Sequence, residues 1–225
     1  MRPDISQALN DVDVYLFDWD GTLGRSLEVW LRVLRRVARD FDLQLTDAEL
    51  ADAAFGKSFT EIAEALGLAD RLDDMRSQVK RQAMRMVRDV DLYPGAREML
   101  NDLRSRGNKL ALISSSFRQS LERAVAHNQL DGVFDVVISG DDVSSLKPDP
   151  EGITLVLERL SATPDRAVMV GDSVYDIRAA ENAGIASVLF YPPSHQLFYN
   201  REELVALSPT IVVDDLRELC RAKRN

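Results

Sequence analysis

Residues 12–22 read VDVYLFDWDGT, and this stretch determines how the rest of the chain is organised. Val12 to Phe17 is an apolar, partly β-branched run that predicts a buried strand. Asp18 and Asp20 follow it directly, and side chains two residues apart in an extended segment point to the same side. Two carboxylates that close repel each other, so the pair is stable only with a cation between them or with one carboxylate protonated. The alternative interpretation is a simple turn at Asp20-Gly21 after the strand.

Further apolar runs recur beyond this strand and alternate with helical patterns. The runs that predict strands are 110–113, 133–138 and 167–170, with weaker ones at 185–189 and 210–213. The patterns that predict helices are 96–106, 118–127, 151–160 and 174–183. Strands that alternate with helices in this way form parallel sheets, so the sequence predicts an α/β fold of the doubly wound type.

The stretch 26–91 breaks this alternation because it contains no strand pattern. A helical insertion placed directly after the first strand would lie above the carboxyl ends of the strands, where α/β sheets bind ligands. We therefore predict two domains, an α/β core of residues 1–24 and 92–225 and an all-helical lid of residues 25–91. Apolar residues at steps of three and four predict the core-facing stripes of its helices: Leu27, Trp30, Leu31, Leu34, Val37, Ala38, Phe41, Leu72, Met75, Val79, Ala83, Met86 and Val90.

Composition excludes several classes of protein. The net charge of −9 argues against a nucleic-acid partner, since phosphate backbones need a concentrated basic face. The most basic stretch, 80–88, has helical spacing and predicts the solvated face of a helix. A single cysteine, Cys220, cannot form an internal disulfide. Because no apolar run approaches the ~20 residues needed to cross a bilayer and no signal-peptide core is visible, we expect a cytoplasmic protein without a membrane partner.

A second acidic cluster, GDSVYD at residues 171–176, comes immediately after the apolar run 167–170. Asp172 and Asp176 are four residues apart and would share one face of an opening helical turn. Asp172 alone would be interpreted as the N-cap of that helix. Together with Asp18 and Asp20 at another strand end, however, the pair forms a concentration of carboxylates, and oxygen ligands of this kind suit Mg²⁺.

Hydroxyl and amino groups are expected at the same edge of the sheet. Ser114 and Ser115 follow the run 110–113, where small hydroxyls and the backbone N–H groups of the next helical turn can donate to a phosphoryl oxygen. For Ser115 or Ser116, the alternative role of helix N-cap is equally good. Lys147 lies in LKPDP, where two prolines restrict the backbone. A lysine held beside carboxylates would neutralise both a carboxylate and an incoming phosphate.

These residues occur in a fixed order that resembles the four motifs of the haloacid dehalogenase-like superfamily: Asp18 with Asp20, Ser114, Lys147, and Asp172 with Asp176. The similarity covers nearly the whole chain. The helical insertion is similar to that family's cap, which is placed after the first motif. The resemblance implies a Rossmann-like core with an inserted all-helical cap domain and a phosphoglycolate phosphatase-like hydrolase.

The resemblance also implies how a phosphate ester would be cleaved. Asp18 would attack phosphorus and form an aspartyl-phosphate intermediate. Asp20 would protonate the leaving oxygen and then deprotonate the hydrolytic water. The phosphoryl group would be bound by Ser114 and Lys147.

The same resemblance implies a metal cofactor. Mg²⁺ would be held by the Asp18 carboxylate, the Asp20 main-chain carbonyl, Asp172 and Asp176, and it would neutralise the phosphoryl oxygens. The expected activity is therefore Mg²⁺-dependent hydrolysis of a small phosphomonoester. The expected partner is a small phosphorylated metabolite, such as phosphoglycolate.

Two positions depart from the family pattern. Many members with this cap have an aspartate where this chain has Arg25, so the hinge into the cap is expected to bond differently. Phe59 stands three residues after Gly56, where β-phosphoglucomutase-like members carry an arginine, and this disfavours a sugar-phosphate mutase. It also disfavours a phosphonate hydrolase, whose cap lysine falls in the same neighbourhood, although Lys57 keeps that alternative open.

The loop that contains Lys57 and Phe59 lies between two helical patterns of the insertion. It would face the active site if the insertion is a lid, and Lys57 is then a candidate for binding the part of the substrate beyond the phosphate. Phe59 would either contact the substrate as well or pack in the cap's own core with Ile62 and Leu66, and the spacing of these residues favours the second interpretation.

Other classes remain as alternatives. A true dehalogenase of the superfamily needs neither Asp20 nor Mg²⁺. A phosphorelay receiver would not need the helical insertion, and a non-catalytic scaffold would be expected to lack a motif residue, whereas none is missing. The histidines, His127 and His195, have no obvious partners and are interpreted as packing or surface residues. The sequence leaves the physiological ester and the oligomeric state open.

Overall fold

The computed structural model of the chain describes residues 5–86 and 90–221. Within them the core is one parallel sheet in the strand order β3-β2-β1-β4-β5-β6. This is the strand order of the Rossmann fold, and it confirms the predicted doubly wound sheet. The strands are β1 (Val14–Phe17), β2 (Lys109–Ile113), β3 (Val136–Ile138), β4 (Ala167–Gly171), β5 (Ala186–Phe190) and β6 (Ile211–Val213).

The predicted core helices are all present. They are α6 (Ala96–Ser105), α7 (Arg118–His127), α8 (Glu151–Leu160) and α9 (Val174–Ala183). Short elements complete the core: α1 (Ile5–Ala8), η2 (Gly140–Asp142), η3 (Pro164–Arg166), η4 (Pro193–Leu197), α10 (Arg201–Ala206) and η5 (Leu216–Arg221). No helix in the described ranges is long and apolar enough to cross a membrane.

The largest difference from the predicted elements is at residues 133–138, where the strand is only three residues long. The Val133 N–H donates to the Leu130 carbonyl at 3.0 Å, which closes a turn. Strand pairing therefore begins only at Val136. The apolar residues before it pack against the core from this turn, so a run of apolar residues overstates the length of the strand.

Both faces of the sheet are covered, because successive strand residues point to opposite sides. Tyr15 and Phe17 of β1 pack in a core with α6, α7 and η5. Val14 and Leu16 pack in a second core with α8 and α9. Each of these four side chains is at most 3% exposed. Burial on both faces explains why the strands read as continuous apolar runs.

The insertion after β1 is helical in its described part. Capping boxes set the starts of two of its helices, at Thr46 and Ser58. The helices enclose a hydrophobic cluster that includes every predicted stripe residue except Met86, whose side chain lies outside the described residues, as do residues 87–89. The elements are α2 (Leu27–Asp40), α3 (Asp47–Ala54), α4 (Phe59–Ala65), η1 (Ala69–Arg71) and α5 (Leu72–Met86).

Two linkers run side by side between the insertion and the core. Gly24 and Leu92 form an antiparallel bridge, and the Arg25 N–H donates to the Asp91 carbonyl at 2.8 Å. The Arg25 guanidinium lies over the Tyr93 ring, 5.9 Å from its centroid, which is a contact that an aspartate could not make. The division into domains at residues 24/25 and 91/92 stays a prediction.

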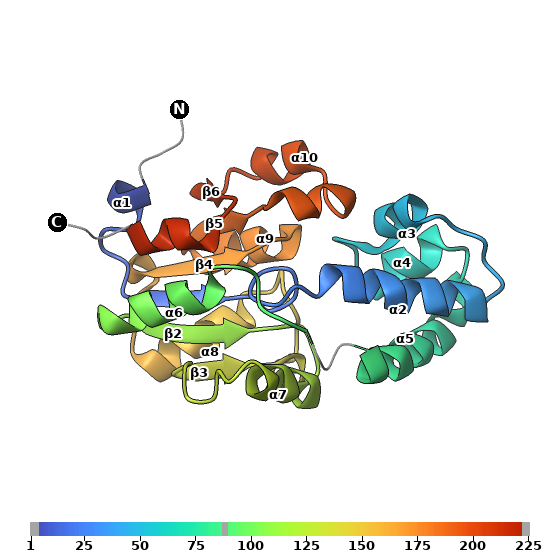
Figure 1. Cartoon of the computed structure of the whole chain (residues 1–225), viewed down its shortest axis with the longest axis horizontal. Helices are drawn as coiled ribbons and strands as arrows, with labels where there is room; N and C mark the ends of the chain where they lie inside the picture. Colours follow the sequence, from blue (N-terminus) through green and yellow to red (C-terminus); the bar gives the residue numbers. More distant parts are fainter. Residues whose placement is uncertain (1–4, 87–89, 222–225) are drawn as a thin grey trace.

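The insertion lies beyond the carboxyl ends of the strands, as Figure 1 shows from the direction of the strand arrows. In the sheet, β2 and β3 lie on one side of β1, and β4 lies on the other side, so the chain changes direction across the sheet after β3. The ends of β1 and β4 therefore form the topological switch point at which α/β sheets bind ligands. The arrangement confirms the predicted α/β core with an inserted helical cap.

Candidate active site

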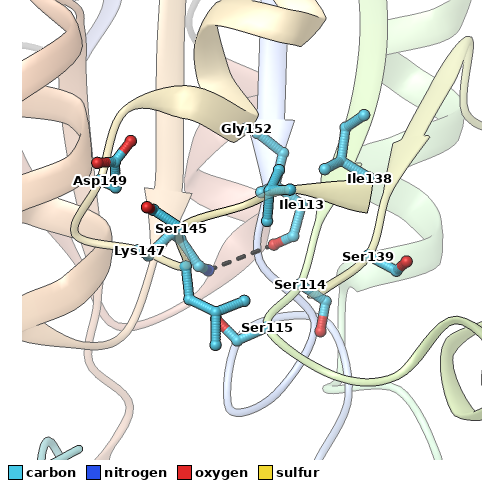
Figure 2. Close-up of a pocket in the computed structure, with 11 residues that line it drawn as sticks. Ile113, Ser114, Ser115, Ile138, Ser139, Ser145, Lys147, Asp149 and Gly152 are labelled. Atoms are coloured by element: carbon cyan, nitrogen blue, oxygen red, sulfur yellow. Dashed lines mark hydrogen bonds between the residues drawn. The ribbon is translucent and has the colours of Figure 1, made fainter. Parts of the chain in front are cut away.

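The loop after β2 brings its serines beside Lys147, as Figure 2 shows. Ser114 is buried, and its Oγ accepts a hydrogen bond from the Ser116 N–H at 3.1 Å. Lys147 lies in the segment before α8, and its Nζ donates to the carbonyl of Ile113, the last residue of β2, at 3.3 Å. Ser114, Ser115 and Lys147 all line one small pocket. The structure thus places these three predicted residues, Ser114, Ser115 and Lys147, next to one another.

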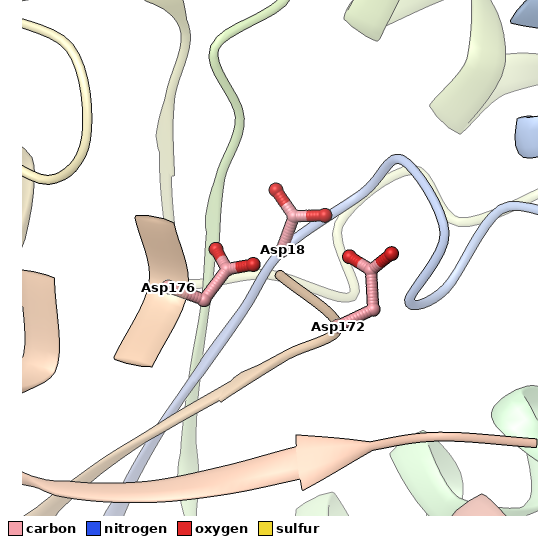
Figure 3. A group of neighbouring side chains, drawn as sticks. All are labelled: Asp18, Asp172 and Asp176. Atoms are coloured by element: carbon pink, nitrogen blue, oxygen red, sulfur yellow. The ribbon is translucent and has the colours of Figure 1, made fainter. Parts of the chain in front are cut away.

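Three carboxylates converge at the ends of β1 and β4, as Figure 3 shows. Asp18 follows β1, Asp172 follows β4, and Asp176 lies in the first turn of α9. One oxygen atom from each carboxylate lies within 4.8 Å of those from the other two, and all three residues are buried. The N-cap of α9 is Ser173, whose N–H and O–H both donate to Asp176 at 3.1 and 2.6 Å. The alternative interpretation of Asp172 as the N-cap is therefore wrong.

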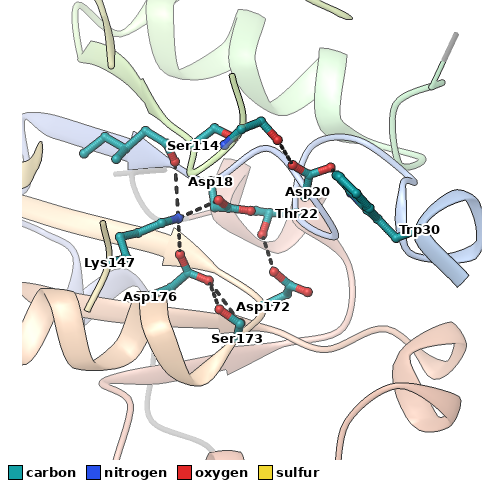
Figure 4. A network of polar contacts seen from close by, with 11 residues as sticks. Asp18, Asp20, Thr22, Trp30, Ser114, Lys147, Asp172, Ser173 and Asp176 are labelled. Atoms are coloured by element: carbon teal, nitrogen blue, oxygen red, sulfur yellow. Dashed lines mark hydrogen bonds and ion pairs between the residues drawn. The ribbon is translucent and has the colours of Figure 1, made fainter. Parts of the chain in front are cut away.

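Lys147 joins the carboxylates to the serine loop, as the network in Figure 4 shows. Its Nζ donates to Asp18 Oδ1 at 2.5 Å and to Asp176 Oδ1 at 2.6 Å. Burial of the ammonium acts to lower the pKa of Lys147, but the carboxylates of Asp176 and Asp18 raise this pKa above its ordinary value. The ammonium therefore stays charged.

Burial also makes the carboxylates difficult to ionise together. It raises the pKa of Asp18 from 3.8 to about 8; the Lys147 charge opposes this shift, and the Asp176 and Asp20 carboxylates add to it. Burial, together with the charges of Asp18 and Asp176, raises the pKa of Asp172 well above its ordinary value. If ionised, the three clustered carboxylates face one ammonium and leave two negative charges in a buried space. A divalent cation would neutralise them.

The donor set fits a hard cation such as Mg²⁺. Asp172 Oδ2 is buried and has no hydrogen-bond partner among the described residues, while Oδ1 accepts from Thr22 Oγ1 at 3.2 Å. A buried oxygen without a partner costs free energy unless a ligand binds it. Gly21 leaves room beside this oxygen, because a Cβ at Gly21 would lie 2.2 Å from Asp172 Oδ2. The all-oxygen cluster can therefore hold a magnesium ion.

The carboxylate of Asp20 is held by two donors that the sequence pattern does not predict. Trp30 Nε1 donates to Oδ1 and Ser116 Oγ donates to Oδ2, both at 2.8 Å. The helical stripe predicts a core position for Trp30, and the ring does pack against the cap's hydrophobic cluster, but it is only half-buried and its Nε1 points to Asp20. The N-cap of α7 is Phe117, so the alternative interpretation of Ser115 or Ser116 as that cap is wrong.

A cavity of about 660 Å³ lies beside Asp20, between the insertion and the core loops. Phe59 lines it and is 41% exposed, so the expectation that Phe59 packs in the cap's own core is wrong.

Lys57 lies outside the described lining of this cavity, and its ammonium donates to the Asp52 carbonyl near the end of α3. The substrate-binding role of Lys57 stays a prediction. Lys80, from the basic stretch that predicts a solvated helix face, does line the cavity, while residues 87 and 88 of that stretch lie outside the described residues.

His195 lies in the core beside the hinge and is fully buried. Its Nε2 lies 2.9 Å from the Tyr93 hydroxyl. The rings of Phe190, Tyr191 and Tyr199 also surround it, with centroids at 5.6 to 5.9 Å. Burial lowers the pKa of His195 from 6.5 to about 3, so the imidazole stays neutral and serves as a packing residue.

Comparisons with known proteins agree with this geometry. The family model of haloacid dehalogenase-like hydrolases matches residues 15–190. The chain is 34% identical over 183 residues to a phosphorylated carbohydrates phosphatase of Thermotoga maritima, with 79% of this chain and 84% of that protein covered. It is 29% identical over 222 residues to the pyrophosphatase PpaX of Listeria monocytogenes, with 95% and 97% covered. The crystal structure of a haloacid dehalogenase-like hydrolase from Bacteroides fragilis matches with a TM-score of 0.82 at 28% identity, covering 92% of this chain and 99% of that one.

Proposed function

This chain belongs to the haloacid dehalogenase-like hydrolase family, and on that premise we propose that it is a Mg²⁺-dependent phosphatase that acts on a small phosphomonoester. The observation that carries the proposal is the convergence of Asp18, Asp172 and Asp176 within 4.8 Å, beside the ammonium of Lys147. Relatives named as a phosphorylated carbohydrates phosphatase and as pyrophosphatases support a small phosphorylated metabolite as the substrate.

Asp18 is the proposed nucleophile. One of its carboxylate oxygens attacks phosphorus, the bond from phosphorus to the leaving oxygen breaks, and an aspartyl-phosphate and an alcohol result. Lys147 holds Asp18 Oδ1 at 2.5 Å, so the carboxylate is oriented before the substrate binds. The same ammonium and the hydroxyls of Ser114 and Ser115 face the negative charge of the phosphoryl oxygens. Ser114 Oγ accepts a hydrogen bond from the Ser116 N–H. Because Ser114 is the acceptor in that bond, its hydroxyl proton remains available to donate to a phosphoryl oxygen.

The magnesium ion would be held by the carboxylates of Asp18, Asp172 and Asp176 and by the main-chain carbonyl of Asp20. When bound, it supplies positive charge that offsets the charge of the carboxylates and of the phosphoryl oxygens. Asp176 is oriented for this role by Ser173 on one oxygen and by Lys147 on the other. These bonds fix the geometry of the carboxylate at the cation site.

Asp20 is the proposed general acid and base. It gives a proton to the leaving oxygen, and as a carboxylate it then accepts a proton from the water that attacks the phosphorus of the aspartyl-phosphate, which regenerates Asp18. The bonds from Trp30 and Ser116 orient the carboxylate for both steps. Since Asp20 also lines the cavity, it lies where the organic part of a substrate would leave.

The alternative classes fit the structure less well. A sugar-phosphate mutase or a phosphonate hydrolase would use a cation in the loop after Gly56, where Phe59 stands and where Lys57 bonds to a backbone carbonyl. A phosphorelay receiver would not need the helical insertion, and a non-catalytic scaffold would not need a buried carboxylate cluster. A dehalogenase would not need Asp20.

Hydrolysis of 4-nitrophenyl phosphate tests the proposed function. We expect turnover with Mg²⁺, loss of turnover in excess chelator, and recovery when Mg²⁺ is added back. Full activity in excess chelator would contradict the role of the metal. A lack of hydrolysis both of this ester and of a panel of phosphorylated metabolites would contradict the phosphatase itself.

A further inference from the structure

The cavity beside Asp20 gathers exposed apolar side chains. Five large hydrophobic side chains are exposed in the described structure, and three of them line this cavity: Phe59, Phe117 and Leu146, which are 41%, 44% and 48% exposed. Trp30 and the apolar residues Val79, Ala83 and Met84 of α5 continue the lining. Apolar side chains that share a hollow favour an apolar ligand, because binding removes their surface from water.

Two of these side chains are aromatic and come from the two sides of the cavity. Phe59 begins α4 in the insertion, and Phe117 ends the serine loop of the core. A flat ring can bury its faces against such walls, whereas a sugar needs a polar partner for each of its hydroxyls. Of the five serine hydroxyls in the lining, two are already bonded within the protein, Ser116 to Asp20 at 2.8 Å and Ser120 to the Met84 sulfur at 3.7 Å.

Two cations on α5 complete the lining. Arg76 and Lys80 are four residues apart and therefore lie on one face of the helix. Arg76 lies 5.8 Å from the centroid of the Phe59 ring, and Lys80 lies 4.5 Å from the centroid of the Phe117 ring. In the described part of the chain neither cation forms a salt bridge. The lining also contains the acidic residues Asp20 and Asp141. Asp20 accepts from Trp30 and Ser116 at 2.8 Å, and Asp141 accepts the Arg118 N–H at 2.7 Å.

We propose that this cavity binds the organic part of a phosphomonoester that is flat and aromatic and that carries a second anionic group, such as a carboxylate, facing Arg76 and Lys80. The proposal rests on the proposed function, because Asp18 and Lys147 must receive the phosphoryl group at the other end. The aromatic part would lie between Phe59 and Phe117. An ester of this class differs from the phosphorylated carbohydrates named for one relative.

Binding of phosphonates, which cannot be hydrolysed, tests the substrate class separately from catalysis. The protein with Mg²⁺ is titrated calorimetrically with 2-hydroxyethylphosphonate, benzylphosphonate and 4-carboxybenzylphosphonate. We expect the benzyl group to improve Kd about tenfold over hydroxyethyl through apolar burial, and the carboxylate to improve it about tenfold again through a charge-assisted contact. Hydrolysis of 4-nitrophenyl phosphate is measured on the same preparation, so that a failure of the phosphatase is distinguished from a failure of the specificity.

Variants identify which residues cause the gain in affinity from the benzyl group and which cause the gain from the carboxylate. The double variant Arg76→Gln with Lys80→Gln should bring the ratio of Kd values for benzylphosphonate and 4-carboxybenzylphosphonate close to one. Arg81→Gln is the matched control, because Arg81 is an exposed cation on the same helix outside the described cavity lining, and it should keep the ratio. Phe59→Ser with Phe117→Ser should remove the benzyl advantage.

Three outcomes would overturn the proposal. Hydroxyethylphosphonate that binds as tightly as benzylphosphonate would indicate a polar substrate. A carboxylate advantage that persists in the Arg76 and Lys80 double variant, or one that is lost equally in Arg81→Gln, would show that these two cations do not recognise an anionic group.

Discussion

The two ends of the proposed active site are built in different ways. At the phosphoryl end, Asp18, Asp172 and Asp176 are buried at strand and helix ends, and hydrogen bonds and ion pairs hold them to neighbouring residues and to the Lys147 side chain, which is 7% exposed. At the leaving-group end, the cavity is lined by exposed apolar side chains and by cations of a surface helix. The first end is organised before a substrate binds, as chemistry requires. The second can change its side chains without disturbing the sheet, as specificity requires.

The largest expected effect is that of a substitution at the phosphoryl end alone. Asp18→Asn keeps the volume of the side chain but removes the nucleophile, so kcat for 4-nitrophenyl phosphate should fall by more than about ten-thousandfold. Circular dichroism should show an intact fold. Asp11→Asn, which changes an exposed aspartate before β1, is the matched control and should keep full activity. Comparable turnover by the Asp18 variant would mean that the nucleophile is another residue.

A smaller loss is expected where the two ends meet, at Asp20. Asp20→Asn removes the general acid, and such catalysis is worth about a hundredfold to ten-thousandfold. The loss should be greatest for alkyl phosphates, because their leaving oxygens need a proton, and least for 4-nitrophenyl phosphate. The comparison of kcat/KM for the two esters checks this, and an equal loss on both would contradict the acid role.

The bond from Trp30 should matter less than Asp20 itself. Trp30→Phe removes the 2.8 Å bond to Asp20 Oδ1 and leaves the Ser116 bond to Oδ2. We expect a loss of about tenfold in kcat/KM for alkyl phosphates, the size of one hydrogen bond to a charged group, and a smaller loss for 4-nitrophenyl phosphate. A larger loss on 4-nitrophenyl phosphate would instead indicate that Trp30 acts through its contact with the organic part of the ester rather than through Asp20.

The smallest expected effect is a change of stability with pH, and it arises at the phosphoryl end, from the titration of Asp18. The pKa of Asp18 is about 8 in the folded chain and near 3.8 when unfolded, so the native state binds more protons between these values, and stability falls as pH rises. The low pKa of His195, about 3 against 6.5, acts in the opposite direction but only below pH 6.5. Without metal, Tm should therefore fall on the order of 5 °C between pH 6.5 and 8.

Two controls identify the origin of this shift. Mg²⁺ should remove most of the fall in Tm, because it favours the ionised carboxylates, and Asp18→Asn should remove it without metal. A fall of the same size in the Asp18 variant would assign the titration to another group, such as Asp172, whose pKa is also raised by burial.

Sequence patterns predict the phosphoryl end well because the backbone fixes it. A residue that directly follows a parallel strand must lie at the ligand edge of the sheet, which is why the positions of Asp18, Ser114 and Asp172 follow from the strand pattern alone. The position of Lys147 is predicted less directly, since only the neighbouring prolines and the family resemblance indicate that its side chain points inward.

The leaving-group end is less predictable because it depends on how the insertion packs on the core. Spacing within a helix places Trp30 and Phe59 on apolar stripes, yet Trp30 bonds to Asp20 and Phe59 lines the cavity. Lys57 and Lys80 both read as helix-surface or loop cations, and only the three-dimensional structure separates them: Lys80 lines the cavity and Lys57 bonds to the Asp52 carbonyl. Periodicity reports that a face is apolar but does not say what that face contacts.

The central claim is that Asp18 carries the phosphoryl group, and its most direct test is to trap that intermediate. In an Asp20→Asn background, 4-nitrophenyl phosphate should still phosphorylate Asp18 because its leaving group needs little help, while hydrolysis of the intermediate is slowed. After acid quench, peptide mass spectrometry should find one phosphoryl group on Asp18 that hydroxylamine removes, and none in Asp18→Asn. A phosphoryl group on any other residue, or turnover by the Asp20 variant with no burst of nitrophenol and no phosphorylated peptide, would contradict the account.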